Sequence, residues 1–241
     1  MDAPPETSNA PSITVVTVVR NSAERLAETI GSLASVRGCL VRHVIIDGAS
    51  SDATVEVIRS HADKLHYWIS EPDGGIYDAM NKGWAAAPTD SWILFLGAGD
   101  RLLSLPGDLS RFSPREVIFG DVRAGNRLFR GTAGFGLTCN NTLHHQALLV
   151  HKSLHPEPPF DTRFKVYADF DFNQRLLRQG VRFVYAPDFL SFALPGGVSA
   201  DKAHLETMRI VRKNYGILWC GAACLYLIFN RLLQNCYGGR R

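Results

Sequence analysis

Four short runs of apolar, largely β-branched residues in the first hundred positions have the length and composition of buried strands. They cover residues 13–19, 44–46, 67–69 and 92–96. The segments between them carry helical patterns, such as Leu26, Ile30 and Leu33 at helical spacing. Strands that alternate with segments of this kind predict an α/β fold, with a mostly parallel central sheet flanked by helices.

An acidic turn follows three of these runs. Asp47 comes directly after the second run, Glu71 and Asp73 after the third, and Asp100 shortly after the fourth. Ligands of open α/β sheets bind beyond the carboxyl ends of the strands. We therefore expect these carboxylates to gather at one edge of the sheet, where they suit a sugar nucleotide with a divalent metal.

The 241 residues suffice for one substantial core. Residues 1–11 contain three prolines and few apolar groups, which predicts a flexible leader. We expect one catalytic domain over 12–205 and a C-terminal helical segment over 206–241. The amino-terminal end lacks the basic start and apolar core of a secretory signal, which favours a cytoplasmic protein.

Composition argues against a nucleic-acid-binding protein and against a protein held together by disulfides or by a paired zinc motif. The formal net charge is +3 and the basic residues form no long run, so nucleic acid is not an expected partner. The five cysteines form neither a disulfide framework nor a paired zinc motif. We interpret them as packing residues.

The segment 215–230 contains sixteen residues without a charge, and Arg212, Lys213 and Arg231 flank it. A helix of that length rises roughly 24 Å, against a hydrocarbon core of about 30 Å. Trp219 and Tyr226 are of the kind found at membrane interfaces. We expect an interfacial or re-entrant helix on the inner face of the cell membrane. A buried helix, a homo-oligomer contact and a true membrane span are the alternatives.

Three successive segments resemble the signatures of family 2 glycosyltransferases, in particular bacterial enzymes of exopolysaccharide or lipid-linked oligosaccharide synthesis. They are DGASSD at 47–52, EPDGGIYDAMNKG at 71–83 and GAGD at 97–100. The resemblance covers roughly residues 12–180, and its middle signature is the most specific. It implies the nucleotide-sugar-binding fold called GT-A and inverting transfer of a sugar from a nucleotide-diphosphate sugar, with a UDP-sugar favoured. The motif of processive synthases, Gln-x-x-Arg-Trp, is missing, which favours addition of a single sugar.

The resemblance also assigns a donor site. It places Asp47 against the nucleobase and Asn81 near the donor, one helical turn from Asp78. Helix capping is the alternative for Asp47, and a solvated helix face is the alternative for Asp78. The predicted donor site consists of Asp47, Glu71, Asp73, Gly74, Asp78 and Asn81.

Asp100 occupies the last position of the Asp-x-Asp metal motif of this family, but Ala98 stands where the first aspartate is expected. Mn²⁺ or Mg²⁺ prefers oxygen ligands and can complete its shell with substrate phosphates and waters. We therefore expect a metal at Asp100 that is held by a reduced set of protein ligands.

Asp169 aligns with the catalytic base of the family, and Asp171 is its competitor. The two side chains would share a face on a strand but diverge by about 200° on a helix. His145, in a His-Gln pair, would touch the diphosphate or the acceptor or join the metal shell; a structural histidine is the alternative. Arg175 could meet phosphate or an anionic lipid head group, and a solvated helix face is its alternative.

The apolar tail favours a polyprenyl-diphosphate-linked saccharide as acceptor. If the tail holds the enzyme at the bilayer, the enzyme meets an acceptor that is anchored in the same bilayer more often. Two other functions compete with transfer. A sugar nucleotidyltransferase would need a phosphate loop near the first strand, and residues 20–23 do not provide one. A non-catalytic binding or scaffold subunit would explain the reduced metal motif.

Overall fold

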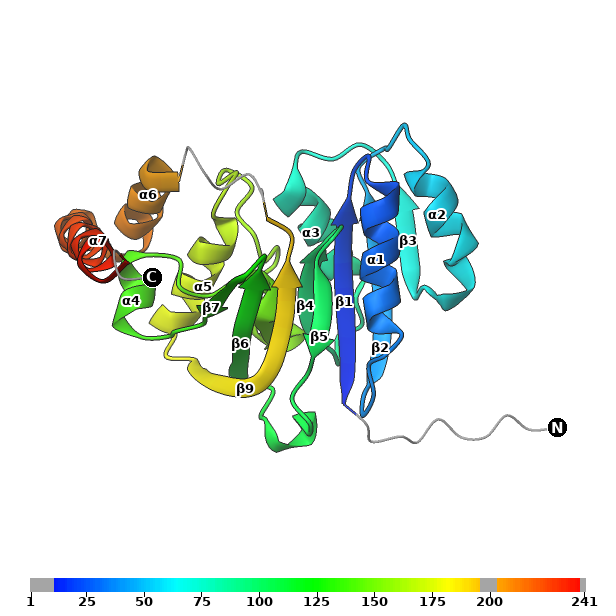
Figure 1. The fold of residues 1–241 in the computed structure, drawn as a ribbon, viewed down its shortest axis with the longest axis horizontal. Helices are drawn as coiled ribbons and strands as arrows, with labels where there is room; N and C mark the ends of the chain where they lie inside the picture. Colours follow the sequence, from blue (N-terminus) through cyan, green and yellow to red (C-terminus); the bar gives the residue numbers. More distant parts are fainter. Residues whose placement is uncertain (1–10, 196–202, 239–241) are drawn as a thin grey trace.

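The computed structural model describes residues 11–195 and 203–238, so all but the last residue of the predicted leader lies outside it. One sheet of nine strands forms the centre, in the order β3-β2-β1-β4-β8-β6-β9-β5, with β7 paired to β6 (Figure 1). The strands are β1 (Ser12–Val19), β2 (Leu40–Asp47), β3 (Tyr67–Ser70), β4 (Trp92–Gly97), β5 (Arg101–Ser104), β6 (Glu116–Ala124), β7 (Arg127–Arg130), β8 (Leu148–His151) and β9 (Arg182–Ala193).

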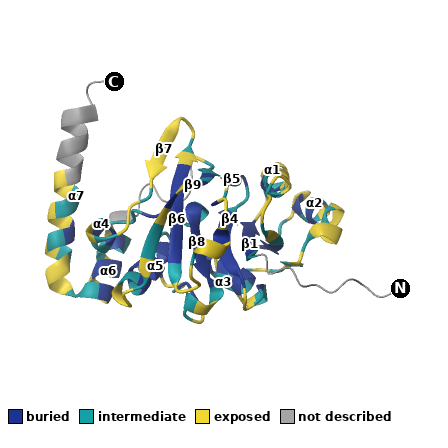
Figure 2. Ribbon diagram, turned by 90° about the horizontal axis from the view of Figure 1, so that it is seen from below, coloured by how far each residue is buried: buried dark blue, intermediate teal, exposed yellow. Residues whose placement is uncertain are grey.

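Helices cover both faces of this sheet. Helices α1 and α2 pack on one face, and α3 and α5 pack on the other (Figures 1 and 2). Short α4 lies with α6 and α7 at the end of the molecule opposite α2 and β3. The helices are α1 (Ala23–Leu33), α2 (Thr54–Ser60), α3 (Ile76–Ala86), α4 (Phe135–Cys139), α5 (Ala168–Arg178), α6 (Ala203–Tyr215) and α7 (Ile217–Gly238), with 3-10 turns at Ala62–Lys64, Leu109–Arg111, His145–Ala147 and Lys152–Leu154.

The first four strands in the chain are parallel, as the alternating pattern predicts. Val16 of β1 lies beside Val44 of β2 and Phe95 of β4, and all three side chains are buried under α3. The second half of the sheet is mixed, because β8 runs antiparallel to both β4 and β6. The start of β8 therefore lies at the same edge as the carboxyl ends of β1, β2 and β4. The turn His145–Ala147 before β8 is brought to the predicted ligand edge in this way.

The helix starts agree with the sequence pattern, although one cap differs. Helix α1 begins directly after Ser22, but the Ser22 hydroxyl donates to the Arg20 carbonyl instead of capping the helix. Ala53 is the N-cap residue of α2, and Asp52 precedes it; the Oδ1 of Asp52 accepts from the Thr54 backbone N–H at 3.0 Å, so it satisfies the first N–H of the helix.

The C-terminal helices form a pair that is separated at Gly216, where φ is +90°. Cys220 and Cys224 of α7 both face Met208 of α6, at 3.6 Å from its carbonyl oxygen and its sulfur respectively. The four cysteines of the described residues are free thiols; Cys139 is buried, Cys39 and Cys220 are half-buried and Cys224 is exposed, so their interpretation as packing residues stays a prediction. No helix within the described ranges is both long and apolar enough to cross a bilayer.

A buried histidine predicts that the fold is sensitive to acid. Burial, and to a smaller extent the charge of His61, lowers the pKa of His43 to about 4, and its Nε2 lies 2.8 Å from the Thr17 hydroxyl. Between pH 6.5 and 4 the unfolded chain therefore binds a proton that the folded chain does not, so stability falls as the pH falls. We expect a loss of about 2–3 kcal/mol between pH 7 and pH 4.5 from this residue.

Urea unfolding at the two pH values measures this effect. The His43→Gln protein is the comparison, because glutamine keeps a polar partner for Thr17 but does not titrate. Equal losses of unfolding free energy in both proteins would show that His43 is not the cause.

Candidate active site

The Asp169 carboxylate, in the first turn of α5, is buried and accepts hydrogen bonds from four donors. Oδ1 accepts from the Tyr77 hydroxyl at 3.1 Å and from the Phe170 backbone N–H at 2.8 Å. Oδ2 accepts from His145 Nδ1 at 3.2 Å and from Asn141 Nδ2 at 3.3 Å. A carboxylate offers about four lone-pair positions. All of them are therefore used within the protein.

Asp169 and His145 are hydrogen-bonded, with Oδ2 3.2 Å from Nδ1. Burial acts to raise the pKa of Asp169, but the hydrogen bond and charge of His145, together with the hydrogen bonds from Phe170 and Tyr77, outweigh it, so this pKa lies below its ordinary value. Burial acts to lower the pKa of His145, and the hydrogen bond and charge of Asp169 reverse that effect, so this pKa is raised. The carboxylate is thus kept ionised, which is the state that can accept a proton.

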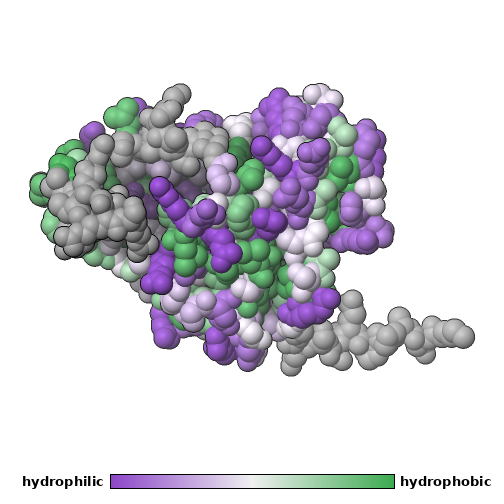
Figure 3. All heavy atoms as spheres, viewed as in Figure 1, coloured by the Kyte–Doolittle hydropathy of each residue, from purple (hydrophilic) through white to green (hydrophobic). Residues whose placement is uncertain are grey.

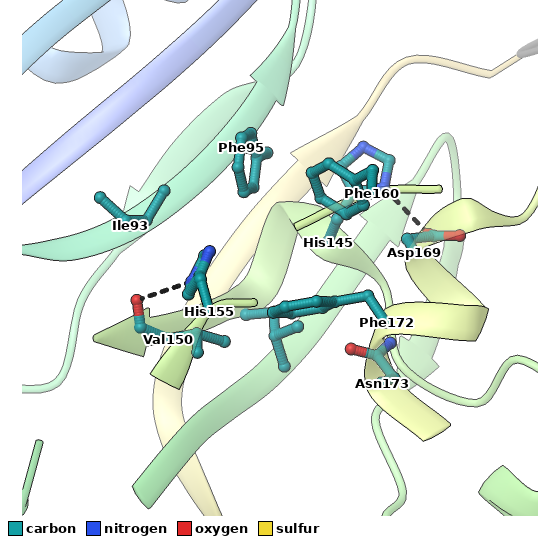
Figure 4. A pocket seen from close by; sticks show the side chains of 10 residues that line it. Ile93, Phe95, His145, Val150, His155, Phe160, Asp169, Phe172 and Asn173 are labelled. Carbon is teal, nitrogen blue, oxygen red and sulfur yellow. Dashed lines mark hydrogen bonds and ion pairs between the residues drawn. The ribbon is translucent and has the colours of Figure 1, made fainter. Parts of the chain in front are cut away.

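Aromatic side chains lie beside this pair on the side that faces the core of the protein. Phe95, Phe160 and Phe172, together with His145 and Asp169, line an internal cavity of about 10 Å³ (Figure 4). A space of that size holds at most about one water molecule. The inner side of the base is therefore closed, and a substrate must approach from the outer edge of the sheet.

The residue after His145 connects the base to the second candidate carboxylate. Gln146 Nε2 donates to Asp100 Oδ2 at 3.1 Å. Asp100 also accepts from the backbone N–H of Gly97 at 2.9 Å and, on Oδ1, from that of Leu194 at 2.9 Å. The His-Gln pair noted in the sequence therefore lies between Asp169 and Asp100.

At the ends of β2 and β3, Asp47 is fully buried and stabilises its own turn. Its Oδ2 accepts from the Ser50 N–H at 3.0 Å and from the Ser70 hydroxyl at 2.6 Å. Asp73 lies beside the same turn, since a Cβ at Gly48 would be 2.4 Å from its Oδ2. The structure therefore brings Asp47 and Asp73 together, and glycine at 48 leaves room for the second carboxylate.

The turn before α3 holds the remaining predicted donor residues. Asp78 accepts from the Gly74 N–H at 2.9 Å, and Gly75 has a φ of +117°, which favours glycine. Glu71 forms an ion pair with Lys82 at 2.7 Å, and both side chains are partly exposed. These groups lie at the surface, so a ligand can reach them.

Asn81 has contacts that the sequence does not reveal. Its Nδ2 donates to the Phe160 carbonyl at 2.9 Å, and its Oδ1 accepts from the Phe160 N–H at 3.0 Å. The amide therefore holds the segment that places Phe160 under the base. A contact between Asn81 and the donor stays a prediction.

Asp171 and Arg175 pair with each other, and Asp171 also contacts α6; a contact of either residue with the acceptor or the diphosphate stays a prediction. Asp171 is fully buried and pairs with Arg175 at 2.9 Å and with Lys213 of α6 at 2.7 Å; Asn214 Nδ2 also donates to it at 3.0 Å. Because 168–178 is a helix, Asp169 and Asp171 point in different directions. The cluster around Asp171 joins α5 to α6.

Three residues of the site were not assigned a role from the sequence. Tyr77 looked like a packing residue, and Asn141 and Gln146 carried no motif of their own. Tyr77 and Asn141 donate to Asp169, and Gln146 donates to Asp100. The His-Gln pair was the one signal that could have pointed to Gln146.

Comparison with known proteins settles the family. Residues 14–102 match the model for glycosyl transferase family 2. A glycosyltransferase of PGL/p-HBAD biosynthesis from Mycobacterium bovis is 30% identical over 179 residues, which cover 69% of this chain and 70% of the relative. The chain belongs to glycosyltransferase family 2. An uncharacterised glycosyltransferase of Mycobacterium tuberculosis is 39% identical to this family member over 180 residues, 68% of each chain.

Solved structures confirm the GT-A fold of this glycosyltransferase. TarS of S. aureus in complex with UDP superposes with a TM-score of 0.61 at 18% identity, over 84% of this chain and 65% of that one. A mannosyltransferase of Pyrobaculum calidifontis in complex with GDP-Man and Mn²⁺ gives a TM-score of 0.62 at 15% identity, over 88% and 65%. The chain thus spans slightly less than two thirds of these structures, and at these identities the likeness shows the fold alone.

Proposed function

We propose that this glycosyltransferase inverts the anomeric centre while it moves one sugar from a nucleotide-diphosphate sugar to a hydroxyl of a lipid-linked saccharide. The ionised, buried Asp169 at the ligand edge of the sheet is the observation that carries the proposal. UDP-sugars are the favoured donors; complexes with UDP, UDP-GlcNAc and GDP-Man are known for proteins of this fold.

In this reaction the acceptor hydroxyl loses its proton to a carboxylate oxygen of Asp169. The acceptor oxygen attacks the anomeric carbon in line with the bond to the diphosphate, and the nucleoside diphosphate leaves with that electron pair. Because Asp169 already accepts four hydrogen bonds, the incoming hydroxyl must replace one donor. Asn141 makes the longest of the four bonds, and its own Oδ1 is buried without a partner, so we infer that Asn141 yields.

The chain's residues fit a divalent metal that is held mainly by the substrate. Asp100 keeps one lone-pair position open on Oδ1, and the Oε1 of Gln146 is buried without a partner in the protein. These hard oxygen atoms suit Mg²⁺ or Mn²⁺, and diphosphate oxygens and waters would complete the shell. Such a metal supplies charge neutralisation for the leaving diphosphate. The described residues contain no cluster of three or more acidic, histidine or cysteine side chains that could hold a metal. Ala98 stands at the position of the first aspartate of the metal motif, and Gln146 would supply the oxygen ligand that this aspartate would otherwise provide.

Thermal stabilisation by nucleotides tests the donor site without knowledge of the acceptor. We expect one nucleoside diphosphate to raise the melting temperature in the presence of Mn²⁺ or Mg²⁺ more than with EDTA, since a ligand of the native state must stabilise it. The Gln146→Leu protein should lose the metal-dependent part of this shift but keep the metal-independent part.

The outcomes of this panel separate the competing functions. A shift that is equal with metal and EDTA, in the wild type and in Gln146→Leu, would refute the metal site. No shift with any nucleotide or sugar nucleotide, from folded protein, would favour a non-catalytic scaffold subunit. Stabilisation by a nucleoside triphosphate and a sugar phosphate, but by no nucleotide sugar, would favour a nucleotidyltransferase.

A peripheral membrane location is supported by the outer face of α7. Five exposed large apolar side chains of α7 fall within about 120° of the helix circumference, on one face; they are Ile217, Leu218, Leu225, Ile228 and Phe229. Phe135 of α4, 61% exposed, lies against Trp219 and extends this face. Apolar side chains also appear at the end of the molecule formed by α7 in Figure 3. Exposed Arg209 and Arg212 on the adjoining α6 complement an anionic bilayer.

Vesicle co-sedimentation tests this location. The protein should bind vesicles of phosphatidylcholine with phosphatidylglycerol, and the combined change Leu218→Ser, Leu225→Ser and Phe229→Ser should lower the bound fraction by about tenfold, because each exposed side chain contributes burial energy of order 1 kcal/mol or more. Leu103→Ser, a change of a 44% exposed leucine on β5, is the control. Equal binding by all three proteins would refute membrane attachment through α7.

A further inference from the structure

A carboxylate of the C-terminal helical pair holds the segment that leads into the base. Glu206 of α6 accepts from three successive backbone N–H groups, those of Lys165 at 2.6 Å, Val166 at 2.7 Å and Tyr167 at 2.8 Å. Three such bonds to one carboxylate exceed what a solvated surface glutamate makes. Hydrogen bonds to a charged group are also stronger than those between neutral groups.

The segment 165–167 has a direct connection to Asp169. The Tyr77 hydroxyl donates both to the Val166 carbonyl, at 2.8 Å, and to Asp169 Oδ1, at 3.1 Å. Tyr167 is the residue that precedes α5, and its side chain does not cap the helix. A displacement of this segment would therefore move the start of α5 and one hydrogen-bond partner of the base together.

Glu206 places a negative charge beside the start of α5, where the helix dipole favours it. Of its three donors, the Tyr167 N–H belongs to the N-cap residue, and those of Lys165 and Val166 precede the helix. Further along α5, Asp171 pairs with Lys213, and Asn214 Nδ2 donates to Gln174 Oε1 at 3.0 Å. Helix α6 thus fixes α5 at its start and in its middle.

We propose that Glu206 is a positioning residue of the transferase, which sets the position of Asp169 and makes catalysis depend on the docking of the C-terminal helices. This inference rests on the proposed function of Asp169.

Three proteins test the proposal. Glu206→Ala removes all three acceptor contacts, Glu206→Gln keeps an oxygen acceptor without the charge, and Glu56→Ala changes an exposed glutamate of α2 as control. Hydrogen exchange of the amides of 165–167 measures the contact itself. Nucleotide affinity and the rate of donor turnover, with water or an added acceptor, measure its consequence.

In Glu206→Ala we expect these amides to exchange at least about tenfold faster, turnover to fall by about tenfold or more, and nucleotide affinity to stay within about twofold. Glu206→Gln should lie between Glu206→Ala and the wild type, and it decides the question if the alanine protein does not fold. Wild-type exchange at 165–167 in both variants, or a loss of turnover caused only by weaker nucleotide binding, would overturn the proposal. A wild-type protein without turnover would count against the proposed function, while the exchange measurement would still decide whether Glu206 holds the segment.

Discussion

The Asp169→Asn protein is expected to transfer sugar about 10²–10⁴ times more slowly than the wild type, with nucleotide affinity unchanged. Asparagine matches the shape of aspartate but cannot accept the acceptor proton, and a general base contributes a factor of this size. The nucleotide contacts predicted at Asp47 and Asp73 lie on β2 and the turn after β3, so they are not altered. The measurement is steady-state transfer, together with nucleotide binding by calorimetry.

Asp63→Asn is the matched control, because Asp63 is an exposed aspartate on the first 3-10 turn and should leave transfer unchanged. Full transfer by Asp169→Asn would remove Asp169 from the role of base. A parallel loss of nucleotide affinity would instead indicate that the substitution disturbs the donor site.

Asp171→Ala, a change only two positions away, is expected to lower the free energy of unfolding by about 3 kcal/mol. Asp171 is fully buried and pairs with Arg175 and Lys213, so its removal takes one carboxylate partner from each cation and one acceptor from the Asn214 amide. Lys213 keeps Asp161 at 3.0 Å, and the Asn214 amide keeps Gln174 Oε1 at 3.0 Å. Loss of one partner from a buried ion pair costs about 3–5 kcal/mol, and the lower value applies because the two cations are 23% and 32% exposed.

Urea unfolding at neutral pH measures this loss, with Asp63→Ala as the control. At a temperature where the Asp171→Ala protein stays folded, its nucleotide affinity should equal that of the wild type. A change in stability below about 0.5 kcal/mol would contradict the structural role of Asp171. A selective loss of acceptor binding would support the predicted role of Asp171 in acceptor recognition.

These two aspartates show what a local pattern leaves open. The sequence names both as candidates for the base, and the choice depends on whether the segment is a strand or a helix. Residues 168–178 form a helix because Phe170, Phe172 and Leu176 become buried against the sheet, a tertiary effect that local propensity does not reveal. The helical geometry then separates the two carboxylates.

The sequence by itself determined the parallel first half of the sheet, the start of α3 at Ile76 and the carboxylates Asp47 and Asp100 at strand ends. Each follows from short-range patterns of apolar residues, glycine and acidic turns, whose physical cause lies within about ten residues. The resemblance to the family supplied the roles.

Only the tertiary structure decided which side chains meet at the base. Tyr77, Asn141 and His145 reach Asp169 from segments that are 92, 28 and 24 positions away, because β8 runs antiparallel between β4 and β6 and because α3 and α5 pack on one face of the sheet. The three N–H groups held by Glu206 of α6 arise in the same way. Such contacts depend on the packing of whole elements, so no local pattern in the chain encodes them.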